Sequence, residues 1–336
     1  EVQDMAEYKG VLICVEVTED RLASISQELL GCGRKLADAL GEGLAAALVG
    51  SGVKAHAQEA IAFGADRVYV VDDPILKDYS TDAYVAAMEK VVKEAGPQIL
   101  LMGQTSLGRD LAPRLAFRLE TALSTDCIEL DIDPETKNLL QTRPVYGGNA
   151  RATLVTESRP QMATVRQKAM SPLERDDSRQ GEVIGLESGV DPSQIRTKVL
   201  DTVKEEVAGV KLEAAPVVVS GGRGLGGPEG FGQLEELAKL LKGAVGATRS
   251  ATDNGWVPAT IQVGLTGKIV TPDLYIAVAL SGASQHMAGC SGSKNIVAVN
   301  KDPEANIFRE AQFGVVGDYK QVIPALTAKV KKLLAT

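Results

Sequence analysis

Short apolar runs rich in β-branched residues alternate along this chain with helix-length amphipathic stretches, and this alternation constrains the fold most. The first series reads as strand 10–17, helix 25–40, strand 44–49, helix 53–63, strand 67–71, helix 82–95, strand 98–102 and helix 108–119. Strands separated by such helices pair in parallel, and the helices cover both faces of the sheet. The sequence therefore predicts an α/β fold.

A second α/β series follows the first after an interruption. Further β-rich runs at 128–132, 139–145, 152–155 and 162–165 are expected as additions to the first domain, which should include antiparallel strands. The charged, turn-rich stretch from Lys168 to Gly209 is expected to hold one strand and a helix at 194–207. The second series predicts strands 216–220, 244–248, 274–280, 295–300 and 315–317, with helices 231–241, near 285–289, and 320–334. We expect two domains, 1–168 and 211–336, each a mainly parallel sheet flanked by helices, and a boundary segment at 169–210.

Charge and composition narrow the classes of partner. The net charge of −8 disfavours nucleic acid, yet residues 211–336 carry 13 Lys and Arg against 10 Asp and Glu and are dense in glycine. Close backbone approach in a locally positive field suits a phosphate-bearing ligand. No apolar run approaches the roughly 20 residues of a membrane span. No signal peptide is expected, and the four scattered cysteines predict neither a metal site nor a disulfide framework. A reducing compartment fits best: the cytoplasm, or the mitochondrial matrix in a eukaryote.

The glycine-rich segment 221–227 (GGRGLGG) is the first candidate binding element. Gly222, Gly224 and Gly227 satisfy G-x-G-x-x-G between an expected strand and helix, which is the context of a dinucleotide-binding loop. The acidic residue expected about 20 positions later is absent, and Arg249 stands there. A phosphate-contacting loop for another nucleotide, a nicotinamide site using Gly222–Gly227 and a plain turn all remain open on these residues.

Two further loops carry candidate ligand contacts. Val263–Lys268 (VGLTGK) can present backbone N–H groups and a hydroxyl to a ligand, although a hairpin turn explains the same spacing. Residues 281–284 end a buried strand, and Gln285 and His286 then open a helix, where unpaired N–H donors favour anions. His286 is either functional or structural at this point. His56 lies in a helical stretch without such a loop and is expected to be a surface residue.

These residues resemble the large (alpha) subunit of electron-transfer flavoproteins. The similarity is strongest in 215–320 and looser in 8–165. The blocks that carry it are Leu274–Ala277, Ser281–His286 with Gly289, Asn300–Ala305 with Ile307 and Phe308, the 221–224 loop and Val263–Lys268.

The resemblance implies an electron carrier that works as a heterodimer with a beta subunit. FAD would bind the C-terminal domain, and residues 1–168 would form the family's nucleotide-hydrolase-like α/β domain. Electrons would pass from a dehydrogenase, such as an acyl-CoA dehydrogenase of fatty acid β-oxidation, to a quinone- or ferredoxin-linked acceptor. Electron bifurcation from NADH through the beta subunit is a variant that this sequence leaves open. No catalytic acid, base or nucleophile is expected in this chain.

The family's contacts can be carried over by position. Arg223 is implied near the pyrophosphate and ribityl group, and Arg249 beside the flavin ring. Thr248 occupies a position where the family commonly has serine. Thr266 is implied to donate a hydrogen bond to flavin N5, with Gly267 keeping the loop close to the ring.

The other end of the cofactor is assigned in the same way. Ser281, Gln285 and His286 are implied along the phosphate, ribityl and pyrimidine side, with His286 near the C2 carbonyl. Asn300 and Asp318 would hold the adenosine end. The remaining implied contacts are Val263, Gly264, Leu265, Gly282, Ala283 and Ser284. Leu265 stands where the family usually has glutamine. One polar contact that the family makes near the flavin ring is therefore not expected from this residue.

Two other functions compete with the electron carrier. A nicotinamide-dependent oxidoreductase would use the Gly222–Gly227 loop, and the purified protein would then lack a flavin spectrum. A nucleotide-binding sensor module built on residues 8–120 would bind adenine nucleotides in the isolated N-terminal domain.

Overall fold

The chain divides into two compact units in the computed structural model. The model describes residues 8–18, 20–148, 150–202 and 210–334. One unit comprises Glu1–Val145 with Ala150–Thr202, and the other comprises Tyr146–Asn149 with Val203–Thr336. Each unit is built around its own parallel sheet, which confirms the expected α/β class.

The described residues of the first unit form one seven-stranded parallel sheet, in the order β12-β5-β4-β1-β6-β11-β7. The strands are β1 (Val11–Val15), β4 (Leu44–Gly50), β5 (Arg67–Asp72), β6 (Ile99–Gly103), β7 (Leu123–Cys127), β11 (Gln161–Val165) and β12 (Glu182–Gly185). The helices are α1 (Ser24–Leu40), α2 (Ala57–Ala62), α3 (Thr81–Ala95) and α4 (Ser106–Arg118), with short 3₁₀ turns η1 (Val53–His56) and η2 (Pro74–Leu76).

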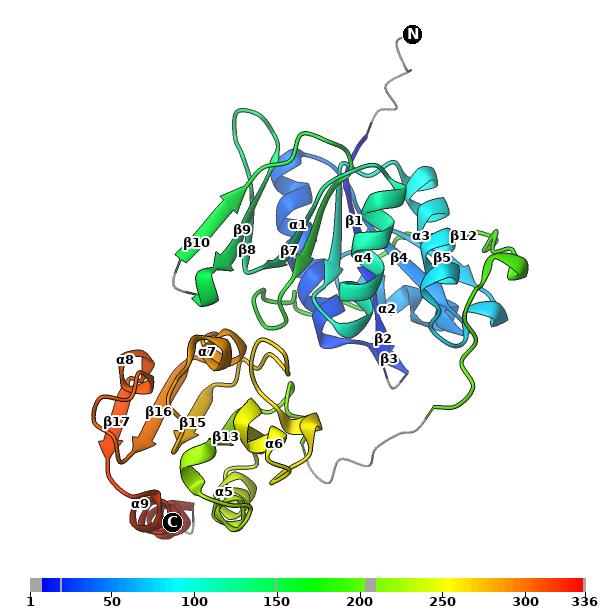
Figure 1. Cartoon of the computed structure of the whole chain (residues 1–336). Coiled ribbons are helices and arrows are strands. Elements are labelled where there is room, and N and C mark those ends of the chain that lie inside the picture. Colours follow the sequence, from blue (N-terminus) through cyan, green and yellow to red (C-terminus); the bar gives the residue numbers. More distant parts are fainter. Residues whose placement is uncertain (1–7, 19, 149, 203–209, 335–336) are drawn as a thin grey trace. The chain divides into compact units, whose positions relative to one another are not determined.

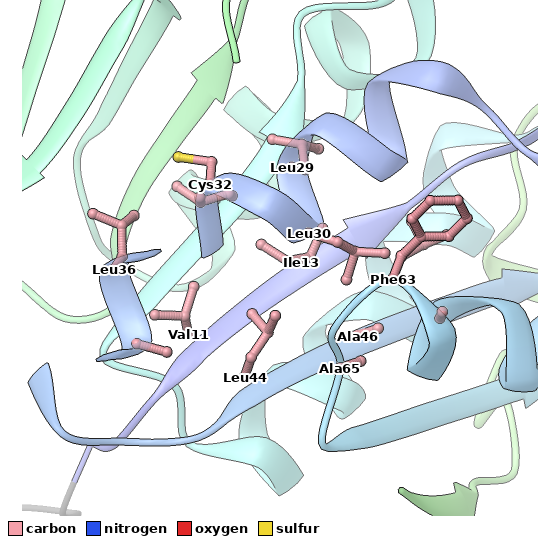
Figure 2. Close-up of a cluster of buried hydrophobic side chains, with 14 of the residues drawn as sticks. Val11, Ile13, Leu29, Leu30, Cys32, Leu36, Leu44, Ala46, Phe63 and Ala65 are labelled. Carbon is pink, nitrogen blue, oxygen red and sulfur yellow. The ribbon is translucent and has the colours of Figure 1, made fainter. Parts of the chain in front are cut away.

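Helices cover both faces of this sheet because its central strands are apolar on both sides. All five residues of β1 are buried. Figure 2 shows Leu29, Leu30 and Leu36 of α1 packed over Val11 and Ile13 of β1. Helices α3 and α4 bury their apolar residues against the opposite face (Figure 1). A parallel sheet with two covered faces reads as continuous apolar runs, which is why its strands are visible in the sequence.

Smaller elements complete the first unit. A second, three-stranded antiparallel sheet has the order β10-β9-β8, from β8 (Glu129–Ile132), β9 (Leu139–Val145) and β10 (Ala150–Leu154). A short hairpin pairs β2 (Val17–Thr18) with β3 (Arg21–Leu22). The turn η4 (Pro192–Gln194) follows β12, whereas the turn η3 (Tyr146–Gly148), which follows β9 in the chain, belongs to the second unit.

The second unit is a five-stranded parallel sheet in the order β14-β13-β15-β16-β17. The strands are β13 (Val217–Gly221), β14 (Ala244–Ala247), β15 (Leu274–Val278), β16 (Asn295–Asn300) and β17 (Phe313–Val316). The helices are α5 (Glu229–Leu240), α6 (Arg249–Asp253), α7 (Ser284–Cys290), α8 (Ile307–Glu310) and α9 (Tyr319–Leu334), with turns η5 (Arg223–Leu225) and η6 (Ala259–Ile261). Helices α5 and α9 pack on one face and α7 on the other. Because the chain leaves β13 toward β14 and then crosses back to β15, the order reverses between β13 and β15.

Several expected elements were wrong. No helix covers 195–202: Ile195 is extended, and Arg196 binds Asp82 of α3 through both its backbone N–H (3.2 Å) and its guanidinium (2.7 Å). Tertiary contacts therefore keep this stretch extended. Residues 203–207 of the expected helix lie outside the described residues. Strand β12, from the expected boundary segment, pairs with β5 and belongs to the first unit. Strand β7 was missed because its sequence, LSTDC, carries no apolar alternation.

His56 is also not the surface residue that its helical context suggested. It ends a 3₁₀ turn, its side chain is only 14% exposed, and Nδ1 lies 3.8 Å from the Glu59 carboxylate. The single helix expected at 53–63 is divided at this point into η1 and α2.

Candidate functional site

The second unit contains a cavity of about 640 Å³ where the carboxyl ends of four strands meet. In open parallel α/β sheets, ligands bind outside the carboxyl ends of the strands at the point where the strand order reverses. The cavity lies beside that point, since its walls are the chain segments that follow β13, β14, β15 and β16. Its location thus follows from the topology of the sheet.

Most of the residues expected to contact a ligand line this cavity. They are Arg223, Thr248, Arg249, Val263, Gly264, Leu265, Thr266, Ser281, Gly282, Ala283, Gln285, His286 and Asn300. Sequence reasoning missed Gly224, Ser250, Gln262, Ala279, Leu280, Asp302 and Ala305. Gly224 and Asp302 stood within motifs already singled out, whereas Ala279 and Leu280 read only as the end of a strand.

Three expected contacts do not line the cavity. The Gly267 backbone packs on the carbonyl of Gln262, which an added Cβ would meet at 2.4 Å. Ser284 is exposed at the start of α7, where its hydroxyl lies 3.4 Å from Gln285 Oε1. Asp318 accepts the backbone N–H of Lys320 at 2.9 Å and thereby caps the first turn of α9. Gly267 and Asp318 therefore have structural roles in the fold.

The glycine-rich loop owes its composition to a backbone contact with β15. The Gly222 N–H donates to the Val278 carbonyl and the Gly224 N–H to the Ala279 carbonyl, both at 3.0 Å. A Cβ at either glycine would come within 2.6 Å of the Ala279 oxygen. The close approach presents Arg223, an exposed cation, to the cavity. The first two glycines of the G-x-G-x-x-G spacing are therefore explained without a nicotinamide dinucleotide.

Thr248 and Arg249, which follow strand β14, present a hydroxyl and a guanidinium at the cavity. Thr248 Oγ1 is buried and has no hydrogen-bond partner in the described part of the chain. Such a group usually marks a place where a ligand or water completes the hydrogen bond. The next residue, Arg249, is exposed on α6, with Nε 3.2 Å from the Asp253 carboxylate.

The loop after η6 is fixed by backbone hydrogen bonds on two sides. Val263 N–H donates to the Ala247 carbonyl at 2.8 Å, and Leu265 N–H donates to the Gln285 carbonyl at 2.7 Å. Gly264 has a φ of +144°, which favours glycine there. Thr266 and Leu265 are exposed at the cavity wall, Leu265 to 61%.

His286 is buried, and both of its ring nitrogens have protein partners. Nδ1 lies 3.1 Å from the Val263 carbonyl oxygen, which only accepts, so Nδ1 carries a proton. Nε2 lies 2.9 Å from the Tyr275 hydroxyl and can accept its hydrogen. Burial lowers the pKa of His286 to about 4, against the opposing hydrogen bond to Val263. Both ring nitrogens of His286, the residue implied near the flavin C2 carbonyl, are thus engaged by the protein in this structure.

At the end of β16, the side chain of Asn300 is held by two hydrogen bonds at the cavity wall. Asn300 Nδ2 donates to the Leu280 carbonyl at 2.9 Å, and its Oδ1 accepts the Asp302 N–H at 3.0 Å. Asn300 therefore links the ends of β15 and β16, while Asp302 lines the cavity.

Two other features are absent from the described residues. Within those residues, no group of three or more His, Cys, Asp or Glu side chains is arranged to hold a metal ion. None of the helices they form has the length and apolar character needed to cross a membrane.

Comparison with known proteins gives a consistent result. Residues 11–190 match the electron transfer flavoprotein domain, and residues 211–291 match the electron transfer flavoprotein FAD-binding domain. An electron transfer flavoprotein subunit alpha from Thermoanaerobacterium thermosaccharolyticum is 49% identical over 98% of this chain and 100% of its own length. One from Megasphaera elsdenii is 46% identical over 98% of both chains. Protein FixB from Clostridium saccharobutylicum is 44% identical over 99% of both.

Proposed function

Because this chain belongs to the electron transfer flavoprotein family, as an alpha subunit, we propose that it binds FAD in the cavity of the second unit and carries electrons between other proteins. One observation carries the proposal. All of the cavity's lining residues except Asn300, Asp302 and Ala305 fall within the segment that matches the family's FAD-binding domain. A site located from sheet topology and a site located from sequence similarity therefore coincide.

The residues present fit a flavin dinucleotide. A cavity of about 640 Å³ is within the range of small-molecule sites. Arg223 and Arg249 supply positive charge for the pyrophosphate and for a reduced ring. The hydroxyl of Thr248, which has no hydrogen-bond partner among the described residues, could form a hydrogen bond with the cofactor. The Asp302 carboxylate is an acceptor suited to ribose hydroxyls.

Bound FAD would supply the capacity to take and release electrons one or two at a time. The protein's task is to position the ring and compensate the negative charge of its reduced form. His286 is neutral in its buried position, so that compensation falls to Arg249. His286 instead holds the Val263 carbonyl and so positions the loop that carries Thr266, the residue assigned to flavin N5. Leu265, in place of glutamine, leaves an apolar side chain at the cavity wall.

The partners follow from the family. Alpha subunits pair with beta subunits and with electron-transfer partners, and we assign this chain a beta subunit, an acyl-CoA-type dehydrogenase as donor and a quinone- or ferredoxin-linked acceptor. Bifurcation from NADH would need a second flavin outside this chain. The number of FAD molecules per heterodimer distinguishes the two modes.

Flavin content after co-expression with the beta subunit tests the proposal. Ala283 is exposed and lines the cavity, so Ala283→Trp should fill it and remove one FAD per heterodimer. Gln321→Trp, at an exposed position on α9 away from the cavity, is the matched control and should keep full flavin content. Unchanged flavin in Ala283→Trp would place the cofactor elsewhere. A fall from two FAD to one would support bifurcation, and a fall from one to none would support simple transfer.

A further inference from the structure

A chain of three polar side chains connects α6 to the cavity wall through Gln262. Gln262 is buried, at 9% exposure. Its Nε2 lies 3.0 Å from Thr266 Oγ1, and its Oε1 lies 3.0 Å from Thr252 Oγ1. Its backbone is fixed as well, because its N–H donates to Ala259 and its carbonyl accepts from Lys268 at 2.7 Å. Both polar atoms of the side-chain amide and both polar atoms of the backbone of Gln262 therefore have hydrogen-bond partners.

The order of donors along this chain determines what Thr266 offers to a ligand. An amide nitrogen only donates, so Thr266 Oγ1 accepts from Gln262. The single hydroxyl hydrogen of Thr266 is then free to point into the cavity that Thr266 lines. In the reverse orientation of the amide, Oε1 would face Thr266 and take that hydrogen, which would leave only lone pairs toward the ligand.

The Thr252 hydroxyl is coupled to these two orientations. It lies 2.9 Å from the Arg249 carbonyl and 3.0 Å from Gln262 Oε1. If its single hydrogen goes to Gln262 Oε1, the amide nitrogen faces Thr266, and if it goes to the Arg249 carbonyl, Thr252 would instead accept from a reversed amide. The orientation that leaves Thr266 as a donor is the one in the structure.

We propose that Gln262 is a positioning residue: with Thr252, it holds the Thr266 hydroxyl as a hydrogen-bond donor toward an acceptor nitrogen on the bound flavin ring. The proposal rests on the proposed function, since it needs a flavin in this cavity. Gln262 also lines the cavity, but both ends of its amide are engaged by Thr252 and Thr266, so its effect on the ring should pass through Thr266.

A double-mutant cycle in the FAD-loaded heterodimer tests this dependence. Gln262→Met keeps the length of the side chain and removes its hydrogen bonds. It should weaken FAD binding roughly 2- to 10-fold, as loss of one hydrogen bond would, and shift the flavin absorption spectrum in the same direction as Thr266→Ala. Added to Thr266→Ala, it should cause no further change in either property. A full Gln262→Met effect in the Thr266→Ala background would overturn the proposal.

Thr252 supplies an independent pair of variants, which also serves if Gln262→Met fails to fold. Thr252→Val should reproduce part of the Gln262→Met spectral shift, while Thr252→Ser, which keeps the hydroxyl, should match the wild type. Equal spectra for Thr252→Val and the wild type would count against the relay. A wild-type heterodimer that binds no FAD would refute the proposed function itself, whereas FAD binding with additive Gln262 and Thr266 effects would refute only this inference.

Discussion

His286 is expected to remain uncharged at physiological pH, and this should make the folded chain sensitive to acid. Burial lowers its pKa to about 4 from the ordinary value of 6.5. As the pH falls, the imidazole of the unfolded chain takes up a proton before that of the folded chain. The free energy of unfolding is therefore unaffected by His286 protonation above pH 6.5 and falls progressively between pH 6.5 and pH 4. These two values correspond to a loss of about 2 kcal/mol between pH 8 and pH 5.

The variant His286→Gln removes the titrating group and so isolates this loss. Between pH 8 and pH 5, the unfolding midpoint of the wild type should fall about 4–8 °C further than that of the variant. Glu16 and Glu28, whose pKa values burial raises to about 7, act in the opposite direction in both proteins and cancel in the difference. His56→Gln is the matched control, and it should retain the acid loss assigned to His286.

Nuclear magnetic resonance can observe the same proton directly, because the chain has only two histidines. In His56→Gln, the remaining imidazole should show a proton on Nδ1 throughout pH 6–8 and a titration midpoint below 5. A midpoint at or above 6.5, or a proton on Nε2, would refute the reasoning, because the ring would then not be held between Tyr275 and Val263.

Three further predictions concern charge and hydrogen bonding. Arg249→Ala should lower the midpoint potential of the bound flavin by about 50–150 mV in a spectroelectrochemical titration, because it deletes the positive charge that we propose beside the ring. Arg249→Lys should shift the potential less, and no shift in either variant would place Arg249 away from the ring. Thr248→Val should weaken FAD binding about 3- to 10-fold in a fluorescence titration without destabilising the flavin-free protein, whereas Thr248→Ser should bind normally. Glu16→Gln should raise stability by about 2–3 kcal/mol at pH 8 and change little at pH 4, because burial raises the Glu16 pKa to about 7 and the charged form is the costly one; equal effects at both pH values in denaturant titrations would contradict this.

The sequence could predict the sheets because their core strands carry a local signal. β1 and β15 are apolar and β-branched on both faces, as strands covered on both sides must be. The segment 195–202 could not be predicted in the same way. Its extended conformation depends on Arg196 reaching Asp82, a partner 114 residues away, and no local pattern encodes such a contact.

The site was predictable where loops carry motifs and not where side chains turn inward. The glycine-rich loop and the Val263–Lys268 loop both reach the cavity, as their glycine-containing motifs suggested. The direction of the His286 ring depends on Tyr275, a buried tyrosine eleven residues earlier on the neighbouring strand. Gln262 gave no signal beyond its proximity to the loop, since its role depends on Thr252 in another helix.

Hydrogen–deuterium exchange of the alpha chain within the heterodimer, with and without FAD, tests the central claim most directly. FAD is expected to protect backbone amides of the second unit around the cavity, in the segments 222–225, 248–250, 263–267 and 280–286. The first unit should show no comparable protection at the ends of its own strands, such as the segment 103–108 after β6. Protection centred on the first unit, or none in the second, would contradict the claim that this cavity holds the flavin.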